Sequence, residues 1–266
     1  MHDLTGKVAF VSGAGSVGEG WGNGKATAVL LARQGAMVYG TDISAEAAAE
    51  TRRLIEAEGG TCVTRGVDMT DAAEVKAAVD DCLAHFDRID ILVNNVGGSA
   101  PGDPVTMSEE VWDAQLDLNL KTAFLATKHV IPVMERQGGG AIVNLSSIAG
   151  VRILPDRPHV AYTTTKLGIL GFSRSIAVTY AKKHIRCNTV IPGLMHTPLV
   201  EHRLARTVAG GDVEALIASR NAQVPTGRMG DAWDVAQAVL FLVSDEARYV
   251  TAAEIAVDGG LSAASR

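Results

Sequence analysis

The chain alternates short β-branched or apolar runs with long alanine-rich stretches of helical period. The seven runs expected to form strands are Lys7–Ser12, Met37–Thr41, Cys62–Val67, Ile89–Asn94, Ala141–Leu145, Ile185–Ile191 and Ile255–Val257. The stretches expected to form helices are Gly24–Gln34, Ser44–Glu58, Thr70–His85, Ser108–Gln137, Tyr162–His184 and Asp231–Leu242. Strands that alternate with helices form right-handed βαβ units, and these build a parallel sheet covered on both faces. We therefore expect an α/β fold with a doubly wound, seven-stranded parallel sheet flanked by helices.

The length and the boundary signals favour one domain. The 266 residues contain no Pro/Ser-rich linker and no repeat of 20–50 residues, so residues 1–266 are expected to form a single domain. Ser44, Thr70 and Ser108 are candidate N-caps, because each precedes a helical stretch with Glu or Asp in its first turn. No apolar run approaches the roughly 18 residues of a transmembrane helix. A strand-like run, Val8–Val11, stands where a signal peptide would have its apolar region.

Charge and cysteine usage exclude several classes of function. Lys and Arg number 24 and Asp and Glu 30, a net charge of −6 that disfavours binding to nucleic acid or an anionic membrane. Cys62, Cys82 and Cys187 are widely spaced and form no Cys/His cluster, so we expect buried thiols and no metal site. Such free thiols are typical of a reducing compartment, and we expect a cytoplasmic protein.

A glycine-rich turn joins the first expected strand to the first expected helix. Six glycines lie in the segment from Gly13 to Gly24. Residues without Cβ let backbone N–H groups approach a pyrophosphate, and the N-terminus of the following helix favours its negative charge. The turn therefore predicts a Rossmann-type dinucleotide site. The alternative of a flexible surface loop is disfavoured because the second expected strand ends in an acidic residue.

That acidic residue is Asp42. A carboxylate at this place accepts hydrogen bonds from the adenosine ribose hydroxyls and repels a 2′-phosphate. Neither neighbour, Thr41 or Ile43, is basic. We therefore predict NAD rather than NADP, although Asp42 taken alone could equally be an ordinary acidic loop residue.

Tyr162 and Lys166 are four residues apart at the start of an expected helix and so lie on one face of it. The ordinary pKa of tyrosine, about 10, makes it a poor base near neutrality. A neighbouring ammonium stabilises the phenolate and lowers that pKa. The strand that ends in Ser146-Ser147 would bring a hydroxyl to the same sheet edge, where it can bind a reacting oxygen.

With these motifs in this order, the chain resembles the short-chain dehydrogenases/reductases, in their commonest subgroup of roughly 250 residues. The resemblance covers essentially the whole length. Its motifs are the turn Ser12–Gly24, Asp68, Asn94-Asn95-Val96-Gly97, Asn119 in Leu118–Lys121, Ser146–Gly150, Tyr162–Lys166, Pro192-Gly193 with Thr197, and Val257–Gly260.

The resemblance implies a role for each matching residue. The implied catalytic residues are Asn119, Ser147, Tyr162 and Lys166, with Ser147 preferred over Ser146. Tyr162 would be the general acid/base, Lys166 would lower its pKa and hold the nicotinamide ribose, and Asn119 would relay protons through a water. The implied cofactor-binding residues are Gly13, Ser16, Asn23, Gly24, Asp42, Ile43, Asp68, Met69, Asn95, Val96, Gly97, Tyr162, Lys166, Pro192, Gly193, Met195 and Thr197. Among these, Asp68 and Met69 would meet the adenine, and Pro192 to Thr197 would grip the nicotinamide carboxamide.

The chain also departs from the family pattern. Val17–Trp21 looks like an insertion of about five residues in the glycine turn, which leaves open which of Gly15, Ser16 and Asn23 touch phosphate. Trp21 is either part of a lid over the adenosine or pyrophosphate, or a side chain packed on the first helix. The family's Gly-x-Glu before the last strand is here Ala252-Ala253-Glu254, which we expect to alter packing only.

Two further segments border the expected reacting centre. The loop Val151–His159 carries Arg152 and His159, which contact substrate or are solvated and ion-paired. Residues 199–225 are expected to cover the substrate, and their arginines either attract an anion or form the exposed face of an amphipathic helix.

The expected function is that of an NAD-dependent oxidoreductase that interconverts a secondary alcohol and its ketone by hydride transfer. Sugars, polyols, cyclic alcohols and hydroxysteroids are the candidate substrates. A 3-oxoacyl-thioester reductase is the nearest alternative, and a non-catalytic dinucleotide-binding sensor is a more remote one. An epimerase or dehydratase is disfavoured because such relatives usually carry a larger C-terminal domain. The resemblance implies a homotetramer, or a dimer, packed through the helices at Ser108–Gln137 and Tyr162–His184. Several apolar residues of the second helix fit either that interface or the core, among them Ile169, Leu170, Phe172 and Ile176.

Overall fold

Seven parallel strands form the central sheet of the protein. The computed structural model describes residues 2–153, 158–201 and 212–264. The strands are β1 (Val8–Ser12), β2 (Met37–Asp42), β3 (Cys62–Gly66), β4 (Ile91–Asn94), β5 (Gly140–Leu145), β6 (Ile185–Pro192) and β9 (Glu254–Val257). Their order is β3-β2-β1-β4-β5-β6-β9, and each neighbouring pair runs parallel. The predicted fold class is confirmed.

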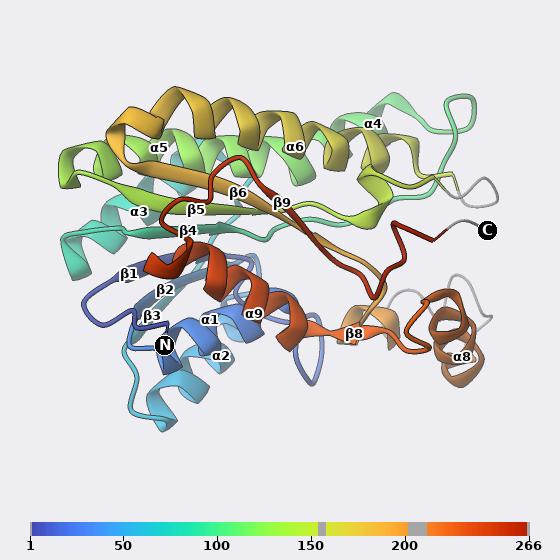
Figure 1. Ribbon diagram of the computed structural model, residues 1–266, viewed down its shortest axis with the longest axis horizontal. Coiled ribbons are helices and arrows are strands. Elements are labelled where there is room, and N and C mark those ends of the chain that lie inside the picture. Colours follow the sequence, from blue (N-terminus) through green and yellow to red (C-terminus); the bar gives the residue numbers. More distant parts are fainter. Residues whose placement is uncertain (1, 154–157, 202–211, 265–266) are drawn as a thin grey trace.

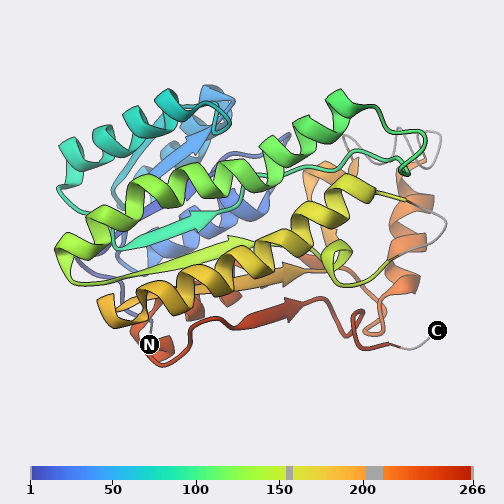
Figure 2. The ribbon, with the colours of Figure 1, turned by 90° about the horizontal axis from the view of Figure 1, so that it is seen from above.

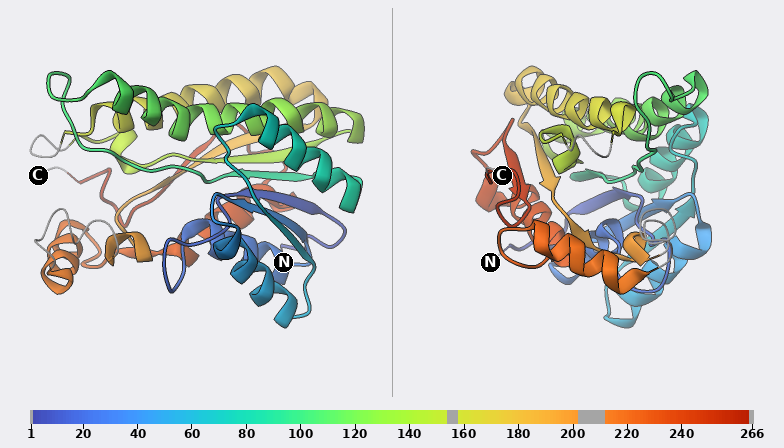
Figure 3. Two further views of the ribbon diagram at one scale, coloured as in Figure 1. Left: turned by 180° about the vertical axis from the view of Figure 1, so that it is seen from behind. Right: turned by 90° about the vertical axis from the view of Figure 1, so that its right-hand side faces the viewer.

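Helices cover both faces of this sheet (Figure 1). One layer holds α1 (Asn23–Arg33), α2 (Ala45–Ala57) and α9 (Ala232–Val243). The other holds α3 (Ala72–Phe86), α4 (Glu109–Leu116), α5 (Thr122–Gln137) and α6 (Val160–Tyr180). Figure 2 shows this second layer from above, and Figure 3 shows the sheet between the two layers.

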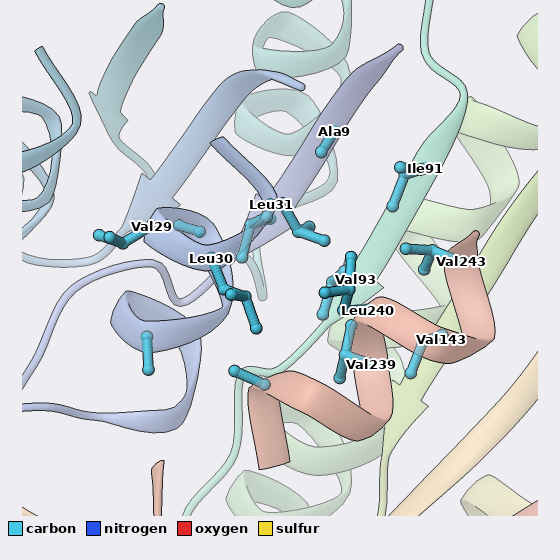
Figure 4. Packing of buried hydrophobic residues seen from close by; sticks show 14 of the residues in the cluster. Ala9, Val29, Leu30, Leu31, Ile91, Val93, Val143, Val239, Leu240 and Val243 are labelled. Carbon is cyan, nitrogen blue, oxygen red and sulfur yellow. The ribbon is translucent and has the colours of Figure 1, made fainter. Parts of the chain in front are cut away.

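Successive residues of a strand contribute their side chains to two separate hydrophobic cores. Ala9 and Val11 of β1 pack with α1 and α9, whereas Val8 and Phe10 pack with the opposite layer. Figure 4 shows the first core, where Ile91 and Val93 of β4 lie near Leu240 and Val243 of α9. Since side chains alternate between the faces of a strand, a sheet covered on both faces needs strands that are apolar throughout.

The strand order reverses between β1 and β4. Ligands bind doubly wound sheets in the crevice at the carboxyl ends of such a pair, because the following loops diverge there to opposite faces. The glycine-rich turn follows β1, and Asn95 to Gly98 follow β4. The fold therefore brings the two segments to one sheet edge.

The helix starts agree with two of the three predicted N-caps. Ser44 accepts a hydrogen bond from the N–H of Ala47, and Ser108 accepts one from that of Val111. The prediction for Thr70 is wrong, because Asp71 caps α3 by accepting from the N–H groups of Ala73 and Glu74. A carboxylate competes well for the positive end of a helix.

The predicted helix Ser108–Gln137 is divided by a π-helical turn, Asp117–Lys121, between α4 and α5. Within residues 199–225, where an amphipathic helix was one alternative, α8 spans Val213–Gln223. Sequence reasoning left out a small second sheet made of β7 (Met195–His196) and β8 (Gly230–Asp231). Short 3₁₀ segments lie at Ile148–Gly150, Ala181–Lys183 and Asp245–Ala247. Among the described helices, none combines the length and the apolar character needed to cross a bilayer.

Candidate active site

The phosphate turn, residues Gly13–Gly24, is built by close backbone packing. Gly13 has a φ of +68°, and a Cβ on Gly24 would overlap the carbonyl oxygen of Gly13 at 1.8 Å. Asn95, which follows β4, donates its side-chain N–H to that same carbonyl at 2.8 Å. Only glycine lets the start of α1 lie this close to the turn.

The N-terminus of α1 has no side-chain cap. Its N-cap is Gly22, and its first turn contains no acidic residue. By contrast, the starts of α2, α3, α4, α8 and α9 are capped by Ser44, Asp71, Ser108, Asp212 and Asp231. The buried hydroxyl of Ser16 has no hydrogen-bond partner within the described residues. Uncapped N–H groups and a spare hydroxyl donor fit the pyrophosphate of a dinucleotide.

Asp42 lies against this turn from the end of β2. Its carboxylate accepts hydrogen bonds from the backbone N–H groups of Gly15 and Ser44, both at 3.0 Å. These contacts hold the carboxylate at the edge of the phosphate turn. Ile43 projects into solvent, with 79% of its surface exposed.

Asp68, Met69 and Val96, three further predicted cofactor residues, lie at the same sheet edge and differ in how they are held. Asp68 accepts hydrogen bonds from the N–H and hydroxyl of Thr70, which hold the pKa of its carboxyl below the ordinary value. Met69 is buried under Thr41. Val96 packs on the second core and against Gly13.

The segment after β6 lies farther along the edge. Gly193 packs tightly against Asp258, which follows β9, and its N–H donates to the carbonyl of Val257. The side chain of Met195 is buried against Gly230, so only its backbone is available to a ligand. Pro192 is buried at the end of β6, and Thr197 is half-buried.

Lys166 lies on α6 and is only 3% exposed. Burial lowers the pKa of its ammonium to about 8. Nζ donates to the carbonyl of Leu145 at the end of β5 (2.9 Å) and lies 5.8 Å from the ring centroid of Tyr162. The predicted Tyr–Lys pair is therefore on one helix face, with the ammonium enclosed beneath the phenol.

The two adjacent serines have different surroundings. Ser146 is buried and donates its hydroxyl to the carbonyl of Lys166 at 2.6 Å. Ser147 lies beside Tyr162, and a hydrogen bond between their side chains lowers the pKa of the phenol, while burial acts more strongly in raising it. The pKa of Tyr162 therefore lies above its ordinary value, and the expected lowering by Lys166 is not seen. This arrangement favours Ser147 over Ser146 as the substrate-orienting serine.

Asn119 lies in the π-helical turn and is fully enclosed. Its Oδ1 accepts from the N–H of Gly98 at 2.9 Å, and its Nδ2 donates to the carbonyls of Gly98 and Gln115. π-Helical turns widen a helix by one residue and are frequent at functional sites. Here the turn directs Asn119 at the loop after β4.

Sequence reasoning missed two sets of buried polar residues. Gln115 accepts a hydrogen bond from the N–H of Ala100 and so ties α4 to the loop after β4. In the sheet, Asn94 donates to Asn144 at 2.7 Å, and Asn144 donates to Ser173 at 2.8 Å. A polar residue inside an apolar strand run, as in Ile142-Val143-Asn144, is the sequence signal for such a network.

The structure also places the residues whose roles were left open. Trp21 packs against Trp233 of α9, with ring centroids 4.7 Å apart, and of the first helix it meets Lys25, whose Nζ lies 5.2 Å from its centroid. Arg152 donates a hydrogen bond to the carbonyl of Leu261. His159 Nδ1 lies 3.3 Å from the carbonyl oxygen of Ala100. Residues 202–211 of the expected covering segment, with two of its three arginines (Arg203 and Arg206), lie outside the described residues.

Comparisons with known proteins extend over almost the entire chain. A family model described as "Enoyl-(Acyl carrier protein) reductase" matches residues 18–262. The 3-oxoacyl-(acyl-carrier-protein) reductase FabG of Thermotoga maritima is 38% identical, over 97% of this chain and 98% of its own length. The cis-4-hydroxycyclohexanecarboxylate dehydrogenase of Sinomonas cyclohexanicum is also 38% identical, over 97% of each chain.

Among solved structures, a putative short-chain dehydrogenase/reductase from Burkholderia xenovorans superposes with a TM-score of 0.94. Its sequence is 49% identical, and 99% of each chain is covered. The similarity thus includes the sheet, both helical layers and the segments at the sheet edge. On this evidence the chain belongs to the short-chain dehydrogenase/reductase family.

Proposed function

We propose that this oxidoreductase interconverts a secondary alcohol and its ketone with NAD as the hydride carrier. The family uses nicotinamide dinucleotide cofactors. The observation that carries the proposal is the buried ammonium of Lys166 beneath the phenol of Tyr162, next to Ser147. A phenol in this setting can exchange a proton with an alcohol oxygen.

In the oxidative direction, the bound NAD supplies the hydride acceptor. Ser147 donates a hydrogen bond to the substrate oxygen and fixes its position between the two hydroxyls. Tyr162, as phenolate, would take the hydroxyl proton as the carbon loses its hydrogen as hydride. The positive charge of Lys166 stabilises the phenolate. Asn119 holds the loop after β4 against Lys166.

NAD is preferred in this proposal because of Asp42. Its carboxylate is fixed by the N–H groups of Gly15 and Ser44 at the edge of the phosphate turn. There it can accept hydrogen bonds from both ribose hydroxyls, while a 2′-phosphate would meet a like charge. The neighbouring Ile43 offers no cation.

A cyclic secondary alcohol is the substrate class we favour, and sugars, polyols and hydroxysteroids remain further candidate classes. The Sinomonas relative is named for oxidising a hydroxycyclohexane, at 38% identity over nearly the full length. The Thermotoga relative and the family-model description support the second candidate, a 3-oxoacyl-thioester reductase. The intact set Asn119, Ser147, Tyr162 and Lys166 disfavours a non-catalytic sensor.

One activity panel separates these candidates. Purified protein is mixed with NAD or NADP and a series of cyclic, sugar and polyol alcohols, and separately with NADH or NADPH and acetoacetyl thioester. We expect reduction of NAD by at least one cyclic alcohol and weaker use of NADP. Faster NADPH oxidation on the thioester than on any ketone would overturn the proposal in favour of the reductase.

For assembly we propose a homotetramer, or a dimer, in the cytoplasm. Phe124 on α5 and Leu167 and Val178 on α6 are exposed apolar side chains. Ile169, Leu170 and Ile176 are instead buried, so these belong to the interior of the subunit. Sedimentation at several protein concentrations tests the assembly.

A further inference from the structure

Among the inserted residues Val17–Trp21, the side chain of Trp21 contacts the body of the protein. The Trp21 ring lies 4.7 Å from the Trp233 ring at an interplanar angle of 56°, and the Nζ of Lys25 lies 5.2 Å from its centroid. Trp233 is in the first turn of α9, and Lys25 is in the first turn of α1. Trp21 therefore bridges two helices that pack against each other below the sheet.

Trp233 is itself held firmly. Its ring is contacted by the guanidinium of Arg33, 4.9 Å from the ring centroid, and Arg33 forms a two-pronged ion pair with Glu58. Asp231 and Asp234, which stand on either side of Trp233 in the chain, form a reciprocal capping box that fixes the start of α9. The partner surface offered to Trp21 is thus part of the rigid scaffold.

The glycines on either side of Trp21 contact the two segments expected to flank a dinucleotide. A Cβ on Gly22 would lie 3.3 Å from the carbonyl oxygen of Gly15 and 3.5 Å from the hydroxyl of Ser16. A Cβ on Gly20 would lie 3.3 Å from Pro198, in the segment after β7. Because Gly20 and Gly22 are bonded directly to Trp21, fixing Trp21 also fixes the positions of these two glycines.

The loop needs such a fixing point because its own sequence does not restrain it. Gly18, Gly20 and Gly22 alternate with other residues, and glycine loses the most conformational freedom when it is ordered. In the ribbon the loop projects beside β8 and the start of α9 (Figure 1, Figure 3). Without the contact between the Trp21 and Trp233 rings, binding of the ligand would itself have to order the residues that face Ser16.

We propose that Trp21 and Trp233 form an anchor that preorganises the phosphate turn, which makes Trp233 a positioning residue for dinucleotide binding. The inference rests on the proposed use of NAD. It differs from the lid hypothesis, in which Trp21 covers the ligand directly and Trp233 has no part. In an anchor the two rings act as a unit, so removing either one removes the whole effect.

A double-mutant cycle tests the anchor. NAD affinity is measured by titration for Trp21→Ala, Trp233→Ala and the double variant, with Trp112→Ala on α4 as the matched tryptophan control. We expect the Kd for NAD to rise roughly tenfold in each single variant and by no more in the double variant. At saturating NAD, kcat should stay within about twofold of the wild type, and Trp233→Phe should restore most of the affinity.

Two results would overturn the anchor: an unchanged Kd in Trp233→Ala, or a double variant whose loss is the product of the single losses. Amide hydrogen exchange without cofactor gives a second measurement that does not depend on the proposed function. We expect the N–H groups of Gly15 and Ser16 to exchange faster in Trp21→Ala and Trp233→Ala than in the wild type. Unchanged exchange there would reject the anchor even if the protein used another ligand.

Discussion

Gly97 lies directly against the ammonium of Lys166. A Cβ on Gly97 would come within 2.9 Å of Nζ and 2.8 Å of the Oδ1 of Asn119. The loop after β4 thus lies so close to both side chains that a Cβ at Gly97 would force them to shift.

We predict that Gly97→Ala displaces Lys166 and Asn119 and lowers kcat by at least about tenfold, because small displacements of catalytic groups cost much of the rate. Gly171→Ala, on the same helix as Lys166, is the control, since its Cβ would meet nothing within 4 Å. Steady-state kinetics of both variants make the comparison. Equal kcat values in the two variants would show that this close approach is irrelevant to turnover.

Tyr162→Phe should keep NAD affinity and reduce kcat by roughly 10²–10⁴-fold, because the variant removes the proton acceptor and leaves the ring in place. Tyr249→Phe is the control, since that side chain is fully exposed. Calorimetric titration with NAD and single-turnover kinetics separate binding from chemistry. Turnover within a few-fold of the wild type would assign the base to another group.

The sheet could be predicted from the sequence because its strands are apolar on both faces and are bounded by polar or glycine residues. Each strand of the seven-stranded sheet lies within two residues of its predicted limits, as Ile185–Pro192 illustrates. The helix starts were less certain, since Thr70 and Asp71 are adjacent and both are able caps. Only the geometry of the backbone decides between such neighbours.

The parts of the site that sequence reasoning did not find depend on contacts between distant segments. Trp21 and Trp233 meet across most of the length of the chain, and no local pattern indicates their pairing. The π-helical turn at Asn119 also has no compositional signal, because Leu118–Lys121 reads as ordinary amphipathic helix. The roles of the predicted catalytic and cofactor residues stay predictions until the variants proposed for them are measured.

Ala252 adopts a left-handed backbone conformation, with a φ of +59°, at the position where the family pattern has glycine. A Cβ in this conformation costs the folded state about 1–2 kcal/mol. Glycine avoids this strain, but its greater freedom also stabilises the unfolded chain and offsets part of the gain. We predict that Ala252→Gly raises the free energy of unfolding by about 0.5–1 kcal/mol without changing kcat. Urea unfolding measures the difference, with Ala253→Gly as the control that should destabilise. A loss of stability in Ala252→Gly would mean that the methyl group packs more favourably than its strain costs.

Asp42→Asn keeps a side-chain acceptor beside Gly15 but removes the charge that would repel a 2′-phosphate. We expect kcat/KM with NAD to fall about tenfold and kcat/KM with NADP to rise, since one charged hydrogen bond contributes about 1.5–3 kcal/mol. Glu46→Gln, which removes a nearby exposed carboxylate in the first turn of α2, is the control. If the ratio of NAD to NADP activity does not change in Asp42→Asn, the carboxylate does not set the preference.

Lys166 gives the folded protein a pH-dependent stability. Burial lowers the pKa of its ammonium from the ordinary 10.5 to about 8. Below pH 8 the group is charged in both the folded and unfolded states, so the folded state bears the full cost of burying the charge. Between pH 8 and 10.5 the folded state has released a proton that the unfolded state still holds, and stability therefore rises with pH across this interval.

We predict that Lys166→Met is more stable than the wild type at pH 7 by about 2 kcal/mol in the absence of cofactor. Removing the buried charge stabilises the folded variant by about 3 kcal/mol, which is the free energy that corresponds to the pKa shift. Loss of the hydrogen bond from Nζ to Leu145 cancels about 1 kcal/mol of this gain. The difference should shrink as the pH approaches 10.5, because the wild-type lysine is then neutral when folded. Urea unfolding of both proteins at pH 7 and pH 10 measures it, with exposed Lys76→Met as the control. A stability difference independent of pH would mean that the buried lysine does not titrate in this range, and that packing alone distinguishes the two proteins.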